Sequence, residues 1–213
     1  MPLYTTDALI LRTYKLGESD RIVVFLTRDR GKKRGVAKNA RQSRRRFGGA
    51  LEPLTAGRVQ YTERERRDLV FLHFVEPHRS PLAAADSEAL GYVGYFAELI
   101  DEWAPEADPN ETLFRLGASM VEALADGVPV EPLARYFEYW LLRLQGVYEQ
   151  DARLSDGARA FLAYARTSTP FALAGVTVPH AALRELEVTH RELISHHLEK
   201  ELRSAKVIRE MRR

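Results

Sequence analysis

The chain of 213 residues contains no cysteine, and this absence removes several kinds of chemistry at once. Disulfides, a cysteine nucleophile, iron–sulfur clusters and cysteine-ligated zinc are all excluded. No run of about 18 apolar residues is free of charge, which excludes a transmembrane helix. The first residues show neither the basic nor the apolar segment of a signal peptide. We therefore expect a cytoplasmic protein without a membrane partner.

Motifs of common enzymes are missing as well. The sequence has no G-x-x-x-x-G-K-[ST], no G-x-G-x-x-G, no G-x-S-x-G and no H-E-x-x-H. His190 and His197 lie seven residues apart on one predicted helix face, but no carboxylate or cysteine completes a metal site, so a structural role is expected for both. Carboxylate pairs fall on polar helix faces, where solvation is the default. We expect no catalytic residue, no metal and no cofactor.

Charge is plentiful and unevenly distributed. The formal net charge is only +2. Residues 1–80 hold 18 Lys and Arg against 9 Asp and Glu, which gives +9, whereas residues 81–213 hold 14 against 21, which gives −7. Such asymmetry indicates a polyanionic partner for the basic part, a separate protein-contact role for the acidic part, and a domain boundary near residue 80.

The hydrophobic pattern changes at the same place. Five runs rich in β-branched and aromatic residues predict strands over 6–13, 20–28, 34–40, 51–62 and 69–75, and short strands so spaced favour a small barrel. After residue 81 a helical period predicts helices over 83–103, 108–127, 131–146, 155–166 and 179–212, with a loop over 167–177. The prediction is an α+β protein of two domains, a five-stranded OB-type barrel over 1–80 and an all-α domain over 81–213.

The strongest functional signal is a basic run that covers the third predicted strand and the segments on either side of it. Residues 30–51 include nine basic residues and no acidic one. Because like charges repel unless an anion lies among them, and Arg matches phosphate oxygens in pairs, a nucleic-acid backbone is the natural ligand. About five phosphate contacts would give a log–log salt slope of roughly −3.5 for single strands and −4.5 for duplex. The alternative is a solvated loop, and the Gly and Arg content predicts mobility until a ligand binds.

Aromatic residues near the run leave two interpretations open. Tyr14, Phe47, Tyr61 and Phe71 could stack on bases, as aromatic residues of OB barrels do, or pack in the core or at its rim. Binding dominated by the phosphate backbone, with little sequence preference, is therefore expected.

Several segments of the chain resemble the RecO family of bacterial recombination mediators, and the likeness extends over essentially the full length. The segments are residues 8–12 (ALILR), 16–23 (LGESDRIV), 26–27 (LT), 31–32 (GK), 35–41 (GVAKNAR) and 43–53 (SRRRFGGALEP). The resemblance implies an N-terminal OB-fold and a C-terminal helical domain. It also implies binding of single- and double-stranded DNA, annealing of complementary strands, and action with RecR in loading RecA onto strands covered by SSB, the single-stranded-DNA-binding protein, whose C-terminal tail is an implied partner. A cytoplasmic, nucleoid-associated location follows.

The chain departs from that family in one respect. Many relatives carry a four-cysteine zinc module after a Leu-rich helix that ends in Gly. Here the corresponding helix ends near Gly146 and the chain passes through residues 149–151 toward the next helix, so the module is interpreted as deleted.

Site residues carry over by resemblance mainly in the basic segment. Arg34, Lys38 and Arg41 match positions that face DNA, Arg44, Arg45 and Arg46 follow in the next loop, and Lys32 and Lys33 adjoin them. A second set, Lys206, Arg209 and Arg212, lies near the C-terminus; it is either a secondary DNA contact or a solvated helix end.

Two other functions compete with a DNA-binding mediator. An OB-type RNA-binding or ribosome-associated protein would use the same basic loop on structured RNA. A metal-dependent phosphodiesterase would need a convergent carboxylate cluster, which the sequence does not show.

Overall fold

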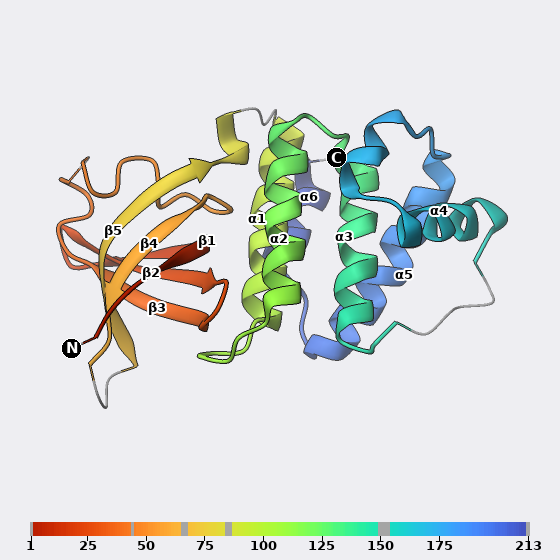
Figure 1. Cartoon of the computed structure of the whole chain (residues 1–213). Coiled ribbons are helices and arrows are strands. Elements are labelled where there is room, and N and C mark those ends of the chain that lie inside the picture. Colours follow the sequence, from red (N-terminus) through yellow and green to blue (C-terminus); the bar gives the residue numbers. More distant parts are fainter. Residues whose placement is uncertain (1, 44, 65–67, 84–86, 149–153, 212–213) are drawn as a thin grey trace.

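Five strands form a closed barrel at one end of the molecule, in a computed structural model that describes residues 2–43, 45–64, 68–83, 87–148 and 154–211 (Figure 1). The strands follow the order β1-β2-β3-β5-β4. The β3–β5 pair is parallel and the other neighbours are antiparallel. Their bounds are β1 (Leu3–Leu16), β2 (Asp20–Thr27), β3 (Gly31–Ala37), β4 (Ala56–Thr62) and β5 (Leu69–Arg79).

Alternating side chains explain why these segments are strands. Val23 and Phe25 of β2 point into the barrel, as do Val70 and Leu72 of β5, and all four belong to the barrel's own core. The residues between them point outward, because successive side chains of a strand face opposite sides. The fourth strand is shorter than predicted, because it begins at residue 56 rather than 51. The third keeps its predicted length but lies three residues earlier, at 31–37 rather than 34–40.

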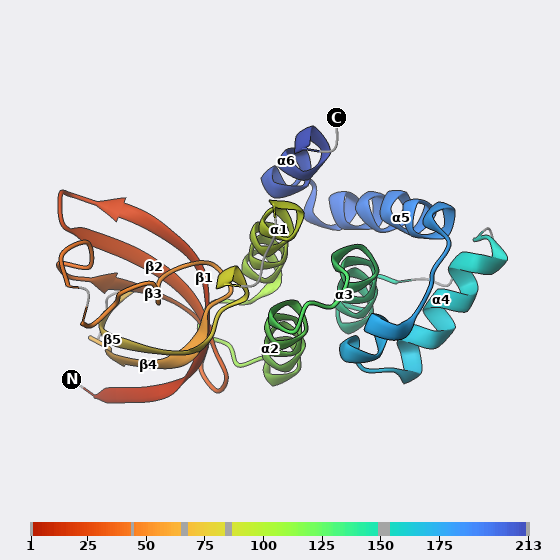
Figure 2. The same ribbon diagram turned by 90° about the horizontal axis from the view of Figure 1, so that it is seen from above.

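Six helices occupy the rest of the described chain, on one side of the barrel (Figures 1 and 2). Two short 3₁₀ helices, η1 (Pro81–Ala83) and η2 (Pro170–Gly175), accompany them, and the second lies in the segment predicted as a loop. The expected order of a five-stranded OB-type barrel followed by helices is confirmed. The helices are α1 (Ser87–Trp103), α2 (Glu111–Ala125), α3 (Val130–Leu144), α4 (Asp156–Thr167), α5 (His180–Leu198) and α6 (Arg203–Met211).

The prediction of one long C-terminal helix was wrong. The chain breaks at Glu199, which takes the left-handed conformation with φ of 53°, and α6 then packs on α1. A carboxylate far away in the sequence fixes the break: Glu98 of α1 accepts hydrogen bonds from the backbone N–H groups of Arg203 and Ser204, at 3.2 and 2.8 Å. These donors lie at the start of α6, where N–H groups lack partners inside the helix.

A second hydrophobic core lies between the outer wall of the barrel and the helices. Leu9, Val24 and Leu26 face outward from the barrel and are buried together with residues of the helices, such as Phe96 and Ile100. The approach is close at Gly117 of α2, where a Cβ atom would lie 2.7 Å from a methyl carbon of Leu9 and 2.9 Å from one of Ile100. Glycine at this position allows α2 to lie directly against the barrel.

No helix within the described ranges has the length and apolar character needed to cross a bilayer.

Candidate nucleic-acid interface

The structure divides the basic run into two parts. In and before β3, each cation has a carboxylate partner: Arg30 pairs with Asp29 at 3.8 Å, Lys32 with Asp101 at 3.2 Å, Lys33 with Glu63 at 2.8 Å and Arg34 with Glu106 at 2.7 Å. Lys32 is also buried, and its Nζ donates to the carbonyl oxygen of Asp101. It therefore helps to attach the barrel to the helices, and a phosphate could reach it only by breaking that contact.

The boundary between barrel and helices is rich in such pairs. Acidic residues of α1, α2 and the connection between them face barrel cations. Part of the net charge of +9 on residues 1–80 is therefore neutralised by part of the −7 on residues 81–213. The expected separation into a basic surface and an acidic surface was therefore too simple. The barrel cations paired across this boundary are Arg12, Arg28, Lys32, Arg34 and Arg79.

The second part of the run carries uncompensated charge. Among the described residues, no carboxylate forms an ion pair with Lys38, Arg41, Arg45 or Arg46, and Lys38, Arg41 and Arg45 are exposed. Arg41 donates instead to a backbone carbonyl, that of Glu18, at 2.8 Å. We call the segment from Lys38 to Arg46 the basic loop; its Arg44 lies outside the described residues. Much of the chain between β3 and β4, which includes the basic loop, lies on the side of the barrel away from the helices (Figures 1 and 2).

Apolar residues just after the basic loop anchor it. Phe47, Ala50 and Leu51 are buried in the barrel core, with exposed fractions of 1%, 2% and 5%. The backbone carbonyl of Arg46 also accepts a hydrogen bond from Val75 of β5 at 3.2 Å. These contacts hold the loop against the barrel.

A turn at the start of the basic loop orients its first residues. Asn39 adopts a left-handed conformation with φ of 53°, and its N–H donates to the carboxylate of Asp20 at 2.8 Å. The hydroxyl of Ser19 contacts the Asn39 side chain at 3.1 Å. The backbone carbonyl of Ser19 accepts a hydrogen bond from the N–H of Arg41, also at 3.1 Å. Asp20 and Asn39 were not predicted as site residues, because only their pairing across the fold reveals their positioning role.

The four candidate aromatic residues separate clearly. Phe47 and Tyr61 are buried in the barrel core and cannot meet a base. Tyr14 is 46% exposed, and Phe71 is partly exposed on the outer face of β5. Lys38 and Arg64 each place a cation over the Phe71 ring, at 5.7 and 4.7 Å from its centre. Arg64 was not among the predicted site residues.

Arg64 also lines a cleft of about 510 Å³. Lys33 and Arg34 line this cleft as well, but so do Glu63 and Glu106. Its charge is therefore mixed, unlike that of the basic loop.

The predicted secondary contact is only partly described. Lys206 is exposed on α6, whereas Arg209 forms an ion pair with Glu201. Arg212 lies outside the described residues, as do residues 149–153, where the deletion of the zinc module was inferred.

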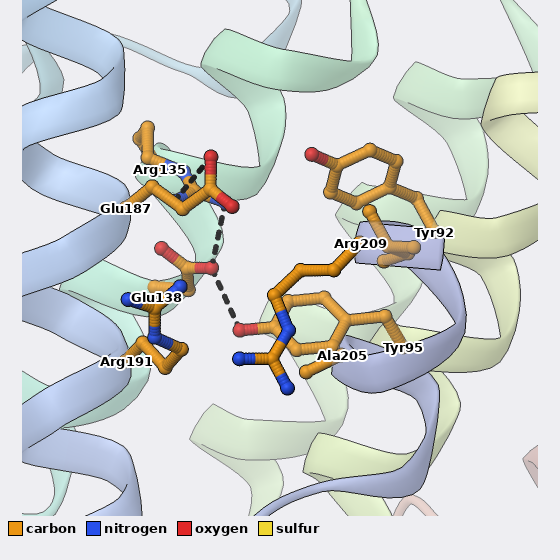
Figure 3. Close-up of a pocket in the computed structure, with 9 residues that line it drawn as sticks. Tyr92, Tyr95, Arg135, Glu138, Glu187, Arg191, Ala205 and Arg209 are labelled. Carbon is orange, nitrogen blue, oxygen red and sulfur yellow. Dashed lines mark hydrogen bonds and ion pairs between the residues drawn. The ribbon is translucent and has the colours of Figure 1, made fainter. Parts of the chain in front are cut away.

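The helical domain contains a separate polar cluster, beside a pocket between α1, α3, α5 and α6 (Figure 3). Glu138 is its centre: it accepts from the hydroxyl of Tyr95 at 2.7 Å, pairs with the buried Arg135 at 3.0 Å and contacts Nδ1 of His190 at 3.0 Å. Burial lowers the pKa of His190, and the Glu138 carboxylate opposes this effect.

His197 and several aromatic side chains of α3 serve packing in the helical domain. His197 does not join His190 but stacks on Trp103, with ring centres 5.6 Å apart. Tyr136, Phe137 and Tyr139 of α3 are buried, so these aromatic residues belong to the core. In the described ranges no group of three or more His, Asp or Glu side chains could hold a metal ion.

The sequence matches models of one known protein family in both halves of the fold. The model "Recombination protein O N terminal" matches residues 1–81, and "Recombination protein O C terminal" matches residues 84–150. A curated protein of Koribacter versatilis named DNA repair protein RecO is 44% identical over 145 residues, which cover 68% of this chain and 59% of the relative. The protein of the same name from Geobacter metallireducens is 40% identical over 147 residues, covering 66% and 57%.

A longer match links the chain to the protein of that name from Pelotomaculum thermopropionicum. It is 34% identical over 185 residues, covering 85% of this chain and 71% of the relative. The first two matches span less than two thirds of their relatives' lengths, at 59% and 57%.

Proposed function

Because this chain belongs to the RecO family, we propose that it is a DNA-binding recombination mediator of DNA repair with no catalytic activity of its own. It binds single- and double-stranded DNA and anneals complementary strands. With RecR it assists the loading of RecA onto SSB-coated single strands, and the SSB tail is a further partner. The protein acts in the cytoplasm, at the nucleoid. RecR, SSB and RecA are proposed by resemblance to the family.

One observation supports DNA binding most directly: the cations of the basic loop have no carboxylate partners among the described residues, and buried apolar side chains hold the loop in place. A phosphate that meets Lys38 or Arg45 need not displace a protein carboxylate, so counterion release is obtained without breaking an ion pair. The proposed contacts are Lys38, Arg41, Arg45 and Arg46, with Arg44 between them. Lys33 and Arg34 join them only when Glu63 and Glu106 are displaced, and Lys206 is a secondary contact.

Strand annealing follows from the same charges. Two single strands repel each other through their phosphates, and a fixed group of cations lowers this repulsion while both strands are held nearby. The proposed contacts hold the phosphate backbone, which leaves base edges free to pair.

The test compares two variants with the same change in charge. In the first, Lys38→Gln and Arg45→Gln remove two cations for which no side-chain hydrogen bond or ion pair is seen within the described ranges. In the control, Arg28→Gln and Arg58→Gln remove two exposed cations that pair with Glu111 and Asp7. We expect the first variant to bind a short oligothymidylate roughly ten-fold more weakly, with a salt slope smaller by about 1.4, and to anneal more slowly.

The control variant should bind almost as well as the unmodified protein. Equal losses in both variants would show that only net charge matters and would refute the placement on the loop. No loss in either would refute DNA binding by this face.

Competition separates the alternative function. A protein that prefers structured or single-stranded RNA to DNA of matched length would be an RNA-binding or ribosome-associated protein instead. Loss of labelled DNA during incubation with magnesium would indicate a phosphodiesterase.

A further inference from the structure

An apolar row crosses the outer face of the barrel beside the basic loop. The strand registers place Tyr14 of β1 opposite Ile22 of β2, Ile22 opposite Val36 of β3, and Val36 opposite Phe71 of β5. Neighbours of these residues on their strands, among them Val23, Ala37, Val70 and Leu72, point into the barrel. The four residues therefore share the outer face, and we call them the apolar row.

The row lies just beyond the area that the helices cover. Two residues along β2 from Ile22, Val24 faces the same side as the row and is buried in the core shared with α1. In the row itself Tyr14 is 46% exposed, and Ile22, Val36 and Phe71 are all partly exposed. Four apolar side chains in contact with water across adjacent strands add nothing to the shared core, and such a patch marks a contact surface.

Cations border the row at both ends. Lys38 and Arg64 lie over the Phe71 ring, and Arg12 donates to the hydroxyl of Tyr14 at 3.2 Å. An apolar strip between cations suits a ligand that has flat apolar faces and regularly spaced negative charges. A nucleotide chain has both: its phosphates can draw Lys38 and Arg64 away from the ring, and a base can take their place over it.

The spacing favours unpaired bases. Neighbouring residues of the row lie on adjacent strands, about 4.8 Å apart. Bases stacked in a duplex rise by only about 3.4 Å and have their faces covered by each other. Only the bases of an extended single strand can place their faces on this row.

We propose that the apolar row is a base-stacking site, with Phe71 as its principal residue, which makes the protein bind single strands more tightly than duplex of equal charge. This inference rests on the proposed DNA-binding function and deepens it. The basic loop serves both forms of DNA through phosphates, whereas Phe71 acts only on exposed bases and so determines specificity.

The experiment uses the full chain and two substitutions at one position. Phe71→Leu keeps an apolar side chain but removes the ring, and we expect about ten-fold weaker binding of oligothymidylate with little change for duplex. Phe71→Trp keeps a ring, so it should retain affinity, and its added indole fluorescence should be quenched when a single strand binds. Phe171→Leu, which removes a 41% exposed ring from η2 in the helical domain, is the matched control and should change neither affinity.

Each other outcome overturns the assignment. Equal losses for single strands and duplex in Phe71→Leu would show that the ring only supports the surface. Unquenched Phe71→Trp fluorescence on a bound single strand would show that no base meets this position. In either case, weaker binding by the Lys38→Gln, Arg45→Gln variant would still support DNA binding by the loop, so the two proposals fail separately.

Discussion

Substitution of Glu98 by alanine tests whether a single carboxylate holds α6 in place. Glu98 accepts from two backbone N–H groups at the start of α6 and from the hydroxyl of Ser204, and it lies 3.9 Å from Arg12 of β1. Helix α6 has nine residues, too few for a stable isolated helix in water. Its position therefore depends on packing against α1 and on this cap.

The magnitude follows from the bonds that are lost. A hydrogen bond to a charged group contributes about 1.5–3 kcal/mol, and the loss of a helix cap costs about 0.5–2 kcal/mol. The freed N–H groups recover part of this from water because the site is only partly buried, so we expect Glu98→Ala to lower the free energy of unfolding by about 2 kcal/mol. Arg12 keeps its ion pair with Asp101, at 3.5 Å, so the loss of its contact with Glu98 should add little to this change.

Two measurements check this expectation. Urea unfolding gives the change in free energy, and hydrogen exchange should show faster exchange of the α6 amides while the barrel amides are unchanged. Glu102→Ala is the matched control, because Glu102 lies one turn along α1 and pairs with the exposed Lys200, an interaction worth less than about 1 kcal/mol. A Glu98→Ala protein with unchanged stability and unchanged α6 exchange would refute the capping role.

The pH dependence of stability gives an independent check. Burial would raise the pKa of Glu98, but the hydrogen bonds from Ser204 and Arg203 and the charge of Arg12 outweigh it, so the pKa is lowered. A carboxyl with a lowered folded-state pKa stabilises fully above its unfolded-state pKa and loses this contribution as pH falls through the folded-state value. The Glu98→Gln variant lacks this carboxyl, so its free energy of unfolding should fall less as the pH is lowered. A fall parallel to that of the unmodified protein would contradict the interpretation.

Three further substitutions test the loop, the boundary and the cleft. Phe47→Ala removes the buried anchor of the basic loop and should lower the free energy of unfolding by about 3–5 kcal/mol, as measured by urea titration. The same substitution should weaken DNA binding. Gly31→Ala places a Cβ atom 2.4 Å from backbone atoms of Asp108 at a φ of 67°, so we expect a loss of at least about 1 kcal/mol in thermal unfolding. Glu106→Gln frees Arg34 and should raise single-strand affinity a few-fold, with a salt slope larger by about 0.7 if Arg34 then meets a phosphate.

The sequence was sufficient to predict the architecture. Alternating side chains define the strands, and Phe25 and Leu72 lie inside the barrel as that alternation requires. A helical period after residue 81 predicted the helices. Their ends were less accurate where a distant residue decides them: nothing near Glu199 signals a break, because its cause, Glu98, lies in another helix.

For the candidate site, composition indicated the basic run and the family resemblance named residues in it, but neither distinguished paired cations from exposed ones. The count of nine basic residues could not show that Lys32 is buried against Asp101 while Lys38 is exposed. Nor could the Gly and Arg content show that Phe47 anchors the loop, since a loop phenylalanine is equally compatible with a stacking role. Contacts between segments that are distant in the sequence decide which cations are exposed and whether Phe47 packs in the core. A single sequence does not show these contacts.

The core shared by barrel and helices limits how these parts can be rearranged in evolution or in the laboratory. A barrel expressed alone would present Leu9, Val24 and Leu26 to water, side by side on its outer wall. It would associate through this wall or aggregate before it could bind a nucleic acid as a separate module. The end of the molecule that carries the basic loop is thus not a detachable part: any fusion, truncation or domain exchange that keeps it must supply a new apolar partner for that wall.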